Sequence, residues 1–306
     1  MAESAPFLAE EPTATDAREA ASEDPSYSLD DPRRGTALGL AHCRFALVVP
    51  ARNEEATIVR VVDSFRTALV REGVQLVRVI VVDDRSTDGT ARLAARAGAE
   101  VHSLLGEGGL ARAFVVGTRA ALDHGATHVL HVDGDGQYSA KDVTAILGEV
   151  ARGVDLVVGN RLHRRPICMS GIRYRANRLF SAFIADMTGV PVDDCQSGYR
   201  AFTRDLILKC DVSGRHTYTQ EQILRAIRLG YRLAWTPISF NERISGKSRL
   251  IRSTISYSLQ VILHVGRVNK SLDGKSWRLA LHAFRAACRE FAPLPQEHHA
   301  ENHDAT

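Results

Sequence analysis

The sequence predicts an α/β protein with a mostly parallel sheet flanked by helices, and three observations support this prediction. Short apolar runs typical of buried strands alternate with segments whose apolar residues recur at helical spacing. The chain has 306 residues, enough for one α/β domain of about 200–250 residues with tails. Its 44% hydrophobic and 25% charged residues are ordinary for a globular protein and exclude collagen-like, wholly disordered and polytopic membrane classes.

The first strand and helix follow a segment without apolar periodicity. Residues 1–42 are rich in Ala, Glu, Asp, Pro and Ser and are predicted to be a disordered tail. The apolar run at 45–49 predicts a buried parallel strand. We expect Asn53 to cap the following helix, whose apolar residues recur at helical spacing: Ile58, Val62, Phe65 and Leu69.

The same cycle repeats along the chain. Further strands are predicted at 77–82, near 101, at 128–132 and at 154–158, with helices at about 90–98, 110–124 and 139–152. Beyond Arg161 the pattern is less regular, and we expect a helix at 173–187, a loop leading into a strand at 193–200, a helix at 220–230 and a strand at 231–238.

Polar residues follow four of the predicted strands. They are Asn53-Glu54, Asp83-Asp84, Asp133 with Asp135, and Asn160-Arg161. Right-handed crossovers bring the carboxyl ends of parallel strands to one edge of the sheet, where open α/β sheets bind ligands. The sequence therefore predicts a binding site at that edge.

Asp133-Gly134-Asp135 is the sharpest local signal. Two carboxylates at a strand end can bind a hard divalent ion that also takes phosphate oxygens. Gln137 can add a carbonyl ligand, and the neighbouring glycines allow a diphosphate to approach the backbone. The triplet alone is equally compatible with a Gly-rich polar turn.

Other residues suit a nucleotide or phosphate. Asp83 and Asp84 can accept hydrogen bonds from a base or from ribose hydroxyls. Several arginines follow the strand predicted at 154–158, at positions 161, 164, 165, 173 and 175. A guanidinium group can bind a phosphate through two hydrogen bonds. Any one of these arginines taken alone is equally compatible with an exposed surface position. The motifs of P-loop, dinucleotide-binding and serine-hydrolase sites are absent from the sequence.

Charge and cysteine content limit the partners and the compartment. The formal net charge is only +3, which argues against nucleic acid as a partner. Five cysteines without a C-x-x-C pair predict reduced thiols in a cytoplasmic protein, not a disulfide framework or structural zinc. The N-terminus lacks the pattern of a secretory signal. The longest uncharged stretch, 253–266, has 14 residues, whereas a spanning helix needs about 20.

Together these segments resemble family 2 glycosyltransferases of the GT-A fold, and are most similar to dolichol-phosphate mannose synthase and other polyprenyl-phosphate glycosyltransferases. The resemblance spans about residues 44–250. Its motifs are 49–55, 81–90, 133–137, 158–161 and 194–202, followed by Glu221 and by Arg243 with Gly246-Lys247-Ser248. Two departures stand out: Arg52 replaces a frequent aromatic residue, and Gly108 replaces a basic or amide residue.

The resemblance implies a role for each matching residue. Pro50, Arg52, Glu54, Asp83 and Asp84 would hold the nucleotide, and Asp133, Asp135 and Gln137 would hold Mg²⁺ or Mn²⁺ on its diphosphate. Arg161 and Arg173 would receive an acceptor phosphate near Asn177; Asp194, Ser197 and Glu221 would shape the sugar and acceptor pocket; Arg243 and Lys247 would lie on a loop over the diphosphate or acceptor. Asp135, Asp194 and Arg161 are the implied catalytic residues.

The implied activity is metal-dependent, inverting transfer of a sugar from a UDP- or GDP-sugar to a polyprenyl phosphate. A phosphate acceptor is already anionic and needs no strong base, whereas a soluble hydroxyl acceptor would need one, for which Asp194 and Glu221 are the candidates. Two alternatives stay open: the same chemistry on such a hydroxyl compound, and a scaffold that binds nucleotide sugars without turnover.

The domain organisation follows from these boundaries. We expect a GT-A domain at 43–250, amphipathic helices at 251–292 and a disordered tail at 293–306. The helices combine apolar stripes with Arg and Lys. They suit either a peripheral anchor at the inner membrane face, or packing on the domain or on a second subunit.

Overall fold

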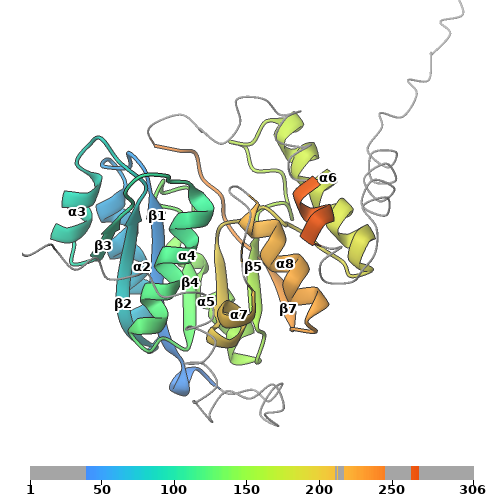
Figure 1. Cartoon of the computed structure of the whole chain (residues 1–306), viewed down its shortest axis with the longest axis horizontal. Coiled ribbons are helices and arrows are strands. Elements are labelled where there is room, and N and C mark those ends of the chain that lie inside the picture. The colour runs from blue at the N-terminus through green and yellow to red at the C-terminus, as the bar shows by residue number, and fades with distance from the viewer. Residues whose placement is uncertain (1–38, 211, 213–216, 245–262, 269–306) are drawn as a thin grey trace, which may run out of the picture.

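One sheet organises the part of the chain that the computed structural model describes, namely residues 39–210, 212, 217–244 and 263–268 (Figure 1). Its seven described strands lie in the order β3-β2-β1-β4-β6-β5-β7. The strands are β1 (Arg44–Ala51), β2 (Gln75–Asp83), β3 (Glu100–Ser103), β4 (His128–His131), β5 (Leu156–Asn160), β6 (Arg200–Thr203) and β7 (Leu233–Pro237).

The helices connect these strands in the predicted alternation. They are η1 (Leu40–His42), α2 (Ile58–Arg71), α3 (Thr90–Arg96), α4 (Leu110–Asp123), η2 (Ala140–Asp142), α5 (Val143–Ala151), α6 (Gly171–Thr188), α7 (Arg204–Lys209) and α8 (Tyr218–Arg228). The predicted α/β fold with a mostly parallel sheet is confirmed. The short helix α7 was not predicted, and η1 lies within the range that we expected to be disordered.

One strand runs against the others. β6 is antiparallel to both of its neighbours, β4 and β5, whereas β1, β2, β3 and β4 are mutually parallel and β5 pairs parallel with β7. Since β6 reverses direction between them, β4 and β5 point the same way. The carboxyl ends of β1, β2, β4 and β5 therefore meet at one edge, as the crossover argument predicts.

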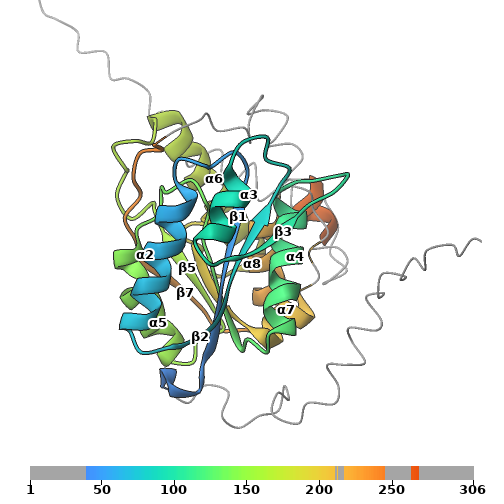
Figure 2. The ribbon, with the colours of Figure 1, turned by 90° about the vertical axis from the view of Figure 1, so that its left-hand side faces the viewer.

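Helices cover both faces of the sheet. Figure 2 shows α2 and α5 on one side and α4, α7 and α8 on the other. Alternate residues of β1 serve the two layers: Phe45 and Leu47 pack with α2, and Ala46 and Val48 pack with α4. Because both faces are buried, β1 is apolar from Phe45 to its end.

The expected helix cap at Asn53 is wrong. Asn53 adopts a φ of 56°, and its side chain accepts a hydrogen bond from Thr87 N (2.8 Å). The residue at the N-cap of α2 is Thr57. Glu54 O accepts hydrogen bonds from Thr57 N and Ile58 N, and this turn places the start of the helix at Ile58. Asn53 instead ties the loop after β1 to the loop after β2.

The predicted terminal segments fall largely outside the described residues. This applies to residues 1–38, to the tail at 293–306, and to the helices at 251–292 except for residues 263–268, which are helical. Within the described residues, no helix has both the length and the apolar character needed to cross a bilayer.

A partly buried histidine gives the fold a predictable pH dependence. His128 stacks on Phe45, with ring centroids 5.2 Å apart, and burial lowers its pKa to about 4. An unfolded histidine has a pKa of about 6.5, so the unfolded chain takes up this proton first as the pH falls. Stability from this group is therefore complete above about pH 6.5 and is lost toward pH 4.

Replacing His128 should remove this contribution. We expect the wild type to lose about 1.5–2 kcal/mol more stability than His128→Phe between about pH 7 and pH 5, because phenylalanine keeps a ring against Phe45 and does not titrate. Urea unfolding at the two pH values measures the difference. Equal pH dependence in the two proteins would contradict the assignment.

Candidate active site

Backbone hydrogen bonds join three strand-end segments. Gly134 N donates to Pro50 O (3.1 Å), and Asp84 N donates to Ala51 O (2.8 Å). The Thr57 hydroxyl also donates to Gly134 O (2.8 Å). The segments around 50–54, 83–84 and 133–137 thus form one continuous site, as the sheet topology predicts.

The residues expected to hold a nucleotide line one side of this site. Asp83 is buried, and its Oδ1 accepts from Ser86 N (3.3 Å). Asp84 accepts from Gly109 N (3.1 Å) and lies beside the guanidinium of Arg52, with Oδ2 and Nη1 3.7 Å apart. Arg52 therefore brings positive charge to this side of the site.

The glycine at position 108 has a local explanation. A Cβ atom at Gly108 would collide with the carboxylate of Asp84 and with the side chain of Arg85. The loop at 106–109 can lie against Asp84 only because this residue has no side chain. Close packing against Asp84 and Arg85 therefore favours glycine at this position.

Three carboxylates converge at the ends of β1 and β4. Glu54 and Asp135 are buried, and Oδ1 of Asp133 is buried without a hydrogen-bond partner among the described residues. Burial raises the pKa of Asp133 to about 7, and the charge of Asp135 adds to the rise. Burial also raises the pKa of Glu54. Such a group of like charges calls for a cation.

Arg243 supplies one cation from the segment after β7. Its Nη1 donates to Glu54 Oε1 (3.0 Å), and its Nη2 donates to Asp135 Oδ2. The predicted loop residue therefore lies within the carboxylate cluster. Lys247, which was predicted to act beside it, lies outside the described residues.

Arg161 and Asp194 form a buried ion pair. Asp194 Oδ2 accepts from Arg161 N (3.1 Å) and Nε (2.7 Å), and Oδ1 accepts from Arg161 Nη2 (2.9 Å) and Gln196 N (3.1 Å). Burial favours loss of the Arg161 charge, but Asp194 outweighs it and raises the pKa of Arg161 above its usual value. All four lone-pair directions of Asp194 are used, so this geometry does not suit it as a general base.

Arg173, an exposed residue in the first turn of α6, lies near enough to the site for its charges to act on it. Burial lowers its pKa, and the nearby charges of Arg161 and Arg243 lower it further. Three guanidinium groups from separate segments are thus close enough to repel one another, an arrangement typical of an anion site. Asn177, one turn further along α6, is buried and contacts the sulfur of Met169 (3.7 Å).

Two further predicted residues are fully buried. Ser197 lies in the loop before β6, and its hydroxyl has no hydrogen-bond partner among the described residues. Glu221 is in the first turn of α8, where Oε1 accepts from Arg225 Nε (3.1 Å) and Oε2 lies 2.9 Å from His264 Nε2. Its described contacts link α8 to the helical segment 263–268, not to Asp133 and Asp135.

Sequence reasoning missed the residue that holds the loop before β6. Arg200 is completely buried and donates to Cys195 O (3.0 Å), Ser197 O (2.7 Å) and Thr219 O (2.8 Å), and to Gln222 Oε1 (3.0 Å). The available signal was an arginine at the start of the buried strand β6, because a buried arginine must be paired and therefore predicts hydrogen-bond partners nearby. His131 supports the same loop through Gly198 O (2.7 Å).

The carboxylates fit a divalent cation bound together with phosphate. Within the described residues, no group of three or more His, Cys, Asp and Glu side chains is placed to hold a metal. Mg²⁺ in nucleotide sites uses only one or two carboxylates, with phosphate oxygens and water completing its shell. Asp133 and Asp135 provide such a pair. Gln137 lies beside them, its Nε2 donating to Asn241 O (3.0 Å).

A family comparison identifies the chain. Residues 46–210, more than half of the sequence, match the family described as glycosyl transferase family 2. The chain belongs to glycosyltransferase family 2. It is therefore an enzyme of the glycosyltransferase class, and the resemblance inferred from its motifs is confirmed.

The chain is similar to curated glycosyltransferases of archaea and bacteria. The chain is 35% identical to glycosyltransferase AglJ of Haloferax volcanii over 65% of its length, and the match covers 64% of AglJ. It is 28% identical to polyprenol monophosphomannose synthase of Mycolicibacterium smegmatis, over 69% of this chain and 83% of that protein.

A solved structure supports the fold. Glucosyl-3-phosphoglycerate synthase of Mycobacterium tuberculosis, crystallised with Mn²⁺, UDP and phosphoglyceric acid, matches 86% of this chain and 84% of its own, with a TM-score of 0.58 and 22% identity. This likeness confirms the GT-A fold of the glycosyltransferase.

The contact between Gly198 and Asp133 generates a prediction for this glycosyltransferase. A Cβ at residue 198 would lie 2.7 Å from Asp133 Oδ2, so Gly198→Ala should displace that carboxylate. We expect sugar transfer to fall by about 100-fold, the scale of a small misplacement in an active site. The measurement is initial rate together with melting temperature.

Gly148→Ala is the matched control. Residue 148 lies in α5, and a Cβ there meets no atom within 4 Å. This variant should keep full activity. Full activity of a folded Gly198→Ala protein would contradict the importance of the contact.

Proposed function

We propose that this enzyme transfers a sugar from a nucleoside-diphosphate sugar to a polyprenyl phosphate, with a divalent metal and with inversion at the anomeric carbon. One observation carries the proposal. The buried, unpartnered oxygen of Asp133 lies beside Asp135 in a site that Arg161, Arg173 and Arg243 also face. Carboxylates for a cation beside arginines for phosphate suit a reaction between two phosphorylated substrates.

The donor occupies the side formed by β1 and β2. Pro50, Glu54, Asp83 and Asp84 surround the base and ribose, whose hydroxyls donate to the carboxylates, and Arg52 lies at the edge of this side. A divalent metal bound by Asp133, Asp135 and Gln137 would neutralise charge that develops on the departing nucleoside diphosphate. Bound UDP and Mn²⁺ in the similar synthase structure are consistent with this class of donor and metal.

The acceptor occupies the side formed by β5 and α6. Arg173 and Arg243 bind its phosphate, and Arg161, whose Nε and Nη2 are held by Asp194, adds positive charge. Asn177 of α6 and Ser197 of the loop before β6 supply buried polar groups on this side. An acceptor phosphate oxygen attacks the anomeric carbon opposite the diphosphate, and the bond from that carbon to the diphosphate breaks. The products are a sugar-linked polyprenyl phosphate and the nucleoside diphosphate.

The state of the carboxylates favours a phosphate acceptor over a hydroxyl acceptor. A hydroxyl would need a base, and both candidates are occupied: Asp194 by Arg161 and Gln196, and Glu221 by Arg225 and His264. A phosphate monoester carries its charge already, since its second pKa is about 6. The name of the mycobacterial relative, a polyprenol monophosphomannose synthase, agrees with this choice. The reaction would then take place at the inner membrane face.

A substrate panel tests the proposal. The protein is incubated with Mn²⁺ or Mg²⁺ and with UDP- and GDP-sugars, with and without a short-chain polyprenyl phosphate, and the products are identified by mass. We expect a sugar-linked polyprenyl phosphate. Transfer only to a water-soluble alcohol would overturn the lipid acceptor, and the absence of both transfer and donor hydrolysis would favour a non-catalytic scaffold.

The metal role has its own test. Asp135→Ala should reduce turnover by at least about 1000-fold, because the developing charge on the diphosphate then lacks its counterion. Asp63→Ala, which removes an exposed carboxylate paired with Arg66 on α2, should leave turnover unchanged. An active Asp135→Ala enzyme, or equal rates with and without a chelator, would rule out the metal role.

A further inference from the structure

Two arginines flank the carboxylate of Asp84. Arg85 lies beside one oxygen, with its Nε 3.3 Å from Oδ1, and Arg52 lies beside the other, with its Nη1 3.7 Å from Oδ2. The Arg52 and Arg85 side chains are 43% and 42% exposed, and the side chain of Asp84 is 13% exposed. A ligand that reaches the carboxylate can therefore also reach both guanidinium groups.

The two oxygens of Asp84 differ in the hydrogen bonds that they can still accept. Oδ1 accepts from Gly109 N (3.1 Å) and from Arg85 Nε (3.3 Å), which uses both of its lone pairs. Among the described residues no hydrogen bond reaches Oδ2, since 3.7 Å to Arg52 is beyond hydrogen-bonding distance. Asp84 thus offers a ligand one free oxygen, with a guanidinium group on either side of the carboxylate.

Arg85 is held in this position by its backbone and by the neighbouring loop. Its φ is 59°, a left-handed conformation that costs free energy for a residue with a side chain and that often marks a functional position. Its Nη1 donates to Gly106 O (3.1 Å), and a Cβ at residue 108 would lie 2.5 Å from its Nε. The loop at 106–109 therefore both binds this guanidinium and leaves room for it beside Asp84.

We propose that Arg52, Asp84 and Arg85 together select a 2,4-dioxopyrimidine base, uracil or thymine, in the donor nucleotide. This inference rests on the proposed function, because it assumes that the ligand at this side of the site is the sugar donor. The pairing edge of such a base presents one N–H group between two carbonyl oxygens. The N–H group matches the free oxygen of Asp84, and the two carbonyls match the two guanidinium groups.

Other bases do not match this order of donors and acceptors. Guanine presents a carbonyl, an N–H group and an amino group in succession, so it brings two adjacent donors to a carboxylate with one free oxygen, and its amino group faces a guanidinium. Adenine and cytosine present an unprotonated ring nitrogen, which would face the carboxylate. The selection therefore arises from mismatches with the wrong bases as well as from the fit of the right one.

Calorimetric titration tests the inference without sugar transfer. The full chain is titrated with UDP, dTDP, GDP and CDP in the presence of Mn²⁺. We expect UDP or dTDP to bind at least about tenfold more tightly than GDP, because an unmatched polar group at the site is costly. The comparison of UDP with dTDP identifies which of the two bases the enzyme uses.

Arg85→Gln should weaken binding of the preferred nucleotide about tenfold, because one charge-assisted hydrogen bond to a carbonyl is lost. GDP binding should be nearly unchanged, so that the ratio of the two dissociation constants approaches one. This ratio cancels any change in the general attraction for a diphosphate. The melting temperature without nucleotide checks that the variant is folded.

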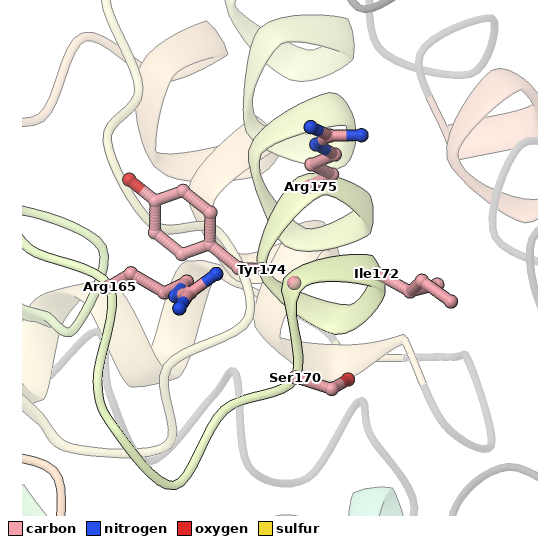
Figure 3. A pocket seen from close by; sticks show the side chains of 6 residues that line it. Arg165, Ser170, Ile172, Tyr174 and Arg175 are labelled. Atoms are coloured by element: carbon pink, nitrogen blue, oxygen red, sulfur yellow. The ribbon is translucent and has the colours of Figure 1, made fainter.

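Arg175→Gln is the matched control, since it removes the same charge at an exposed position. Figure 3 shows this side chain projecting from α6, which lies far from β2 on the other side of the molecule in Figure 1. The control should keep the wild-type ratio.

The outcomes separate this inference from the proposed function. Equal binding of UDP, dTDP and GDP by the wild type, a preference for GDP or CDP, or an unchanged ratio in folded Arg85→Gln would overturn the base selection. Transfer from a GDP-sugar to a polyprenyl phosphate would then leave the proposed function intact. Selective binding of UDP or dTDP without any transfer to a polyprenyl phosphate would instead contradict the proposed function alone, and binding of none of the nucleotides would contradict both.

Discussion

The candidate active site of this glycosyltransferase depends on the hydrogen bonds of one buried arginine. Arg200 fixes the loop before β6 through the carbonyls of Cys195 and Ser197, and joins that loop to α8 through Thr219 O. A buried guanidinium is tolerable only when its donors are satisfied, so the loop has little freedom to adopt another conformation. Two parts of the site follow from it. Asp194, just before the loop, holds Arg161, and Gly198, within it, lies against Asp133.

The site that results has interleaved charges of both signs. Glu54, Asp133 and Asp135 would repel one another if all were ionised and unpaired, and Arg243 relieves part of that repulsion by bonding to Glu54 and Asp135. Asp133 keeps a buried oxygen without a hydrogen-bond partner among the described residues, and burial together with the charge of Asp135 raises its pKa to about 7. A cation that binds together with a diphosphate would therefore contact Asp133, the carboxylate to which Arg243 does not donate.

The sequence predicted the parts of the site that strand order dictates. The polar residues after β1, β2, β4 and β5 lie together because parallel strands end at one edge, and this required only the alternation of strands and helices. It could not predict the direction of β6, because a buried strand has the same apolar period whichever way it runs. Nor could it predict that Asp194 pairs with Arg161. The two residues are 33 positions apart, and the sequence does not show which charged residues contact each other in the fold.

The same limit bears on how the acceptor is chosen. From the sequence, Asp194 and Glu221 are two acids available as bases, and a hydroxyl acceptor is as plausible as a phosphate. In the structure each carboxylate already accepts hydrogen bonds from an arginine, so neither is well placed to take a proton from an acceptor hydroxyl. Arg173, which has no ion pair among the described residues, can bind an anion without removing a proton. Asp194 and Glu221 are thus paired with arginines, whereas Arg173 is available to a ligand. This combination suits an acceptor that already carries a negative charge.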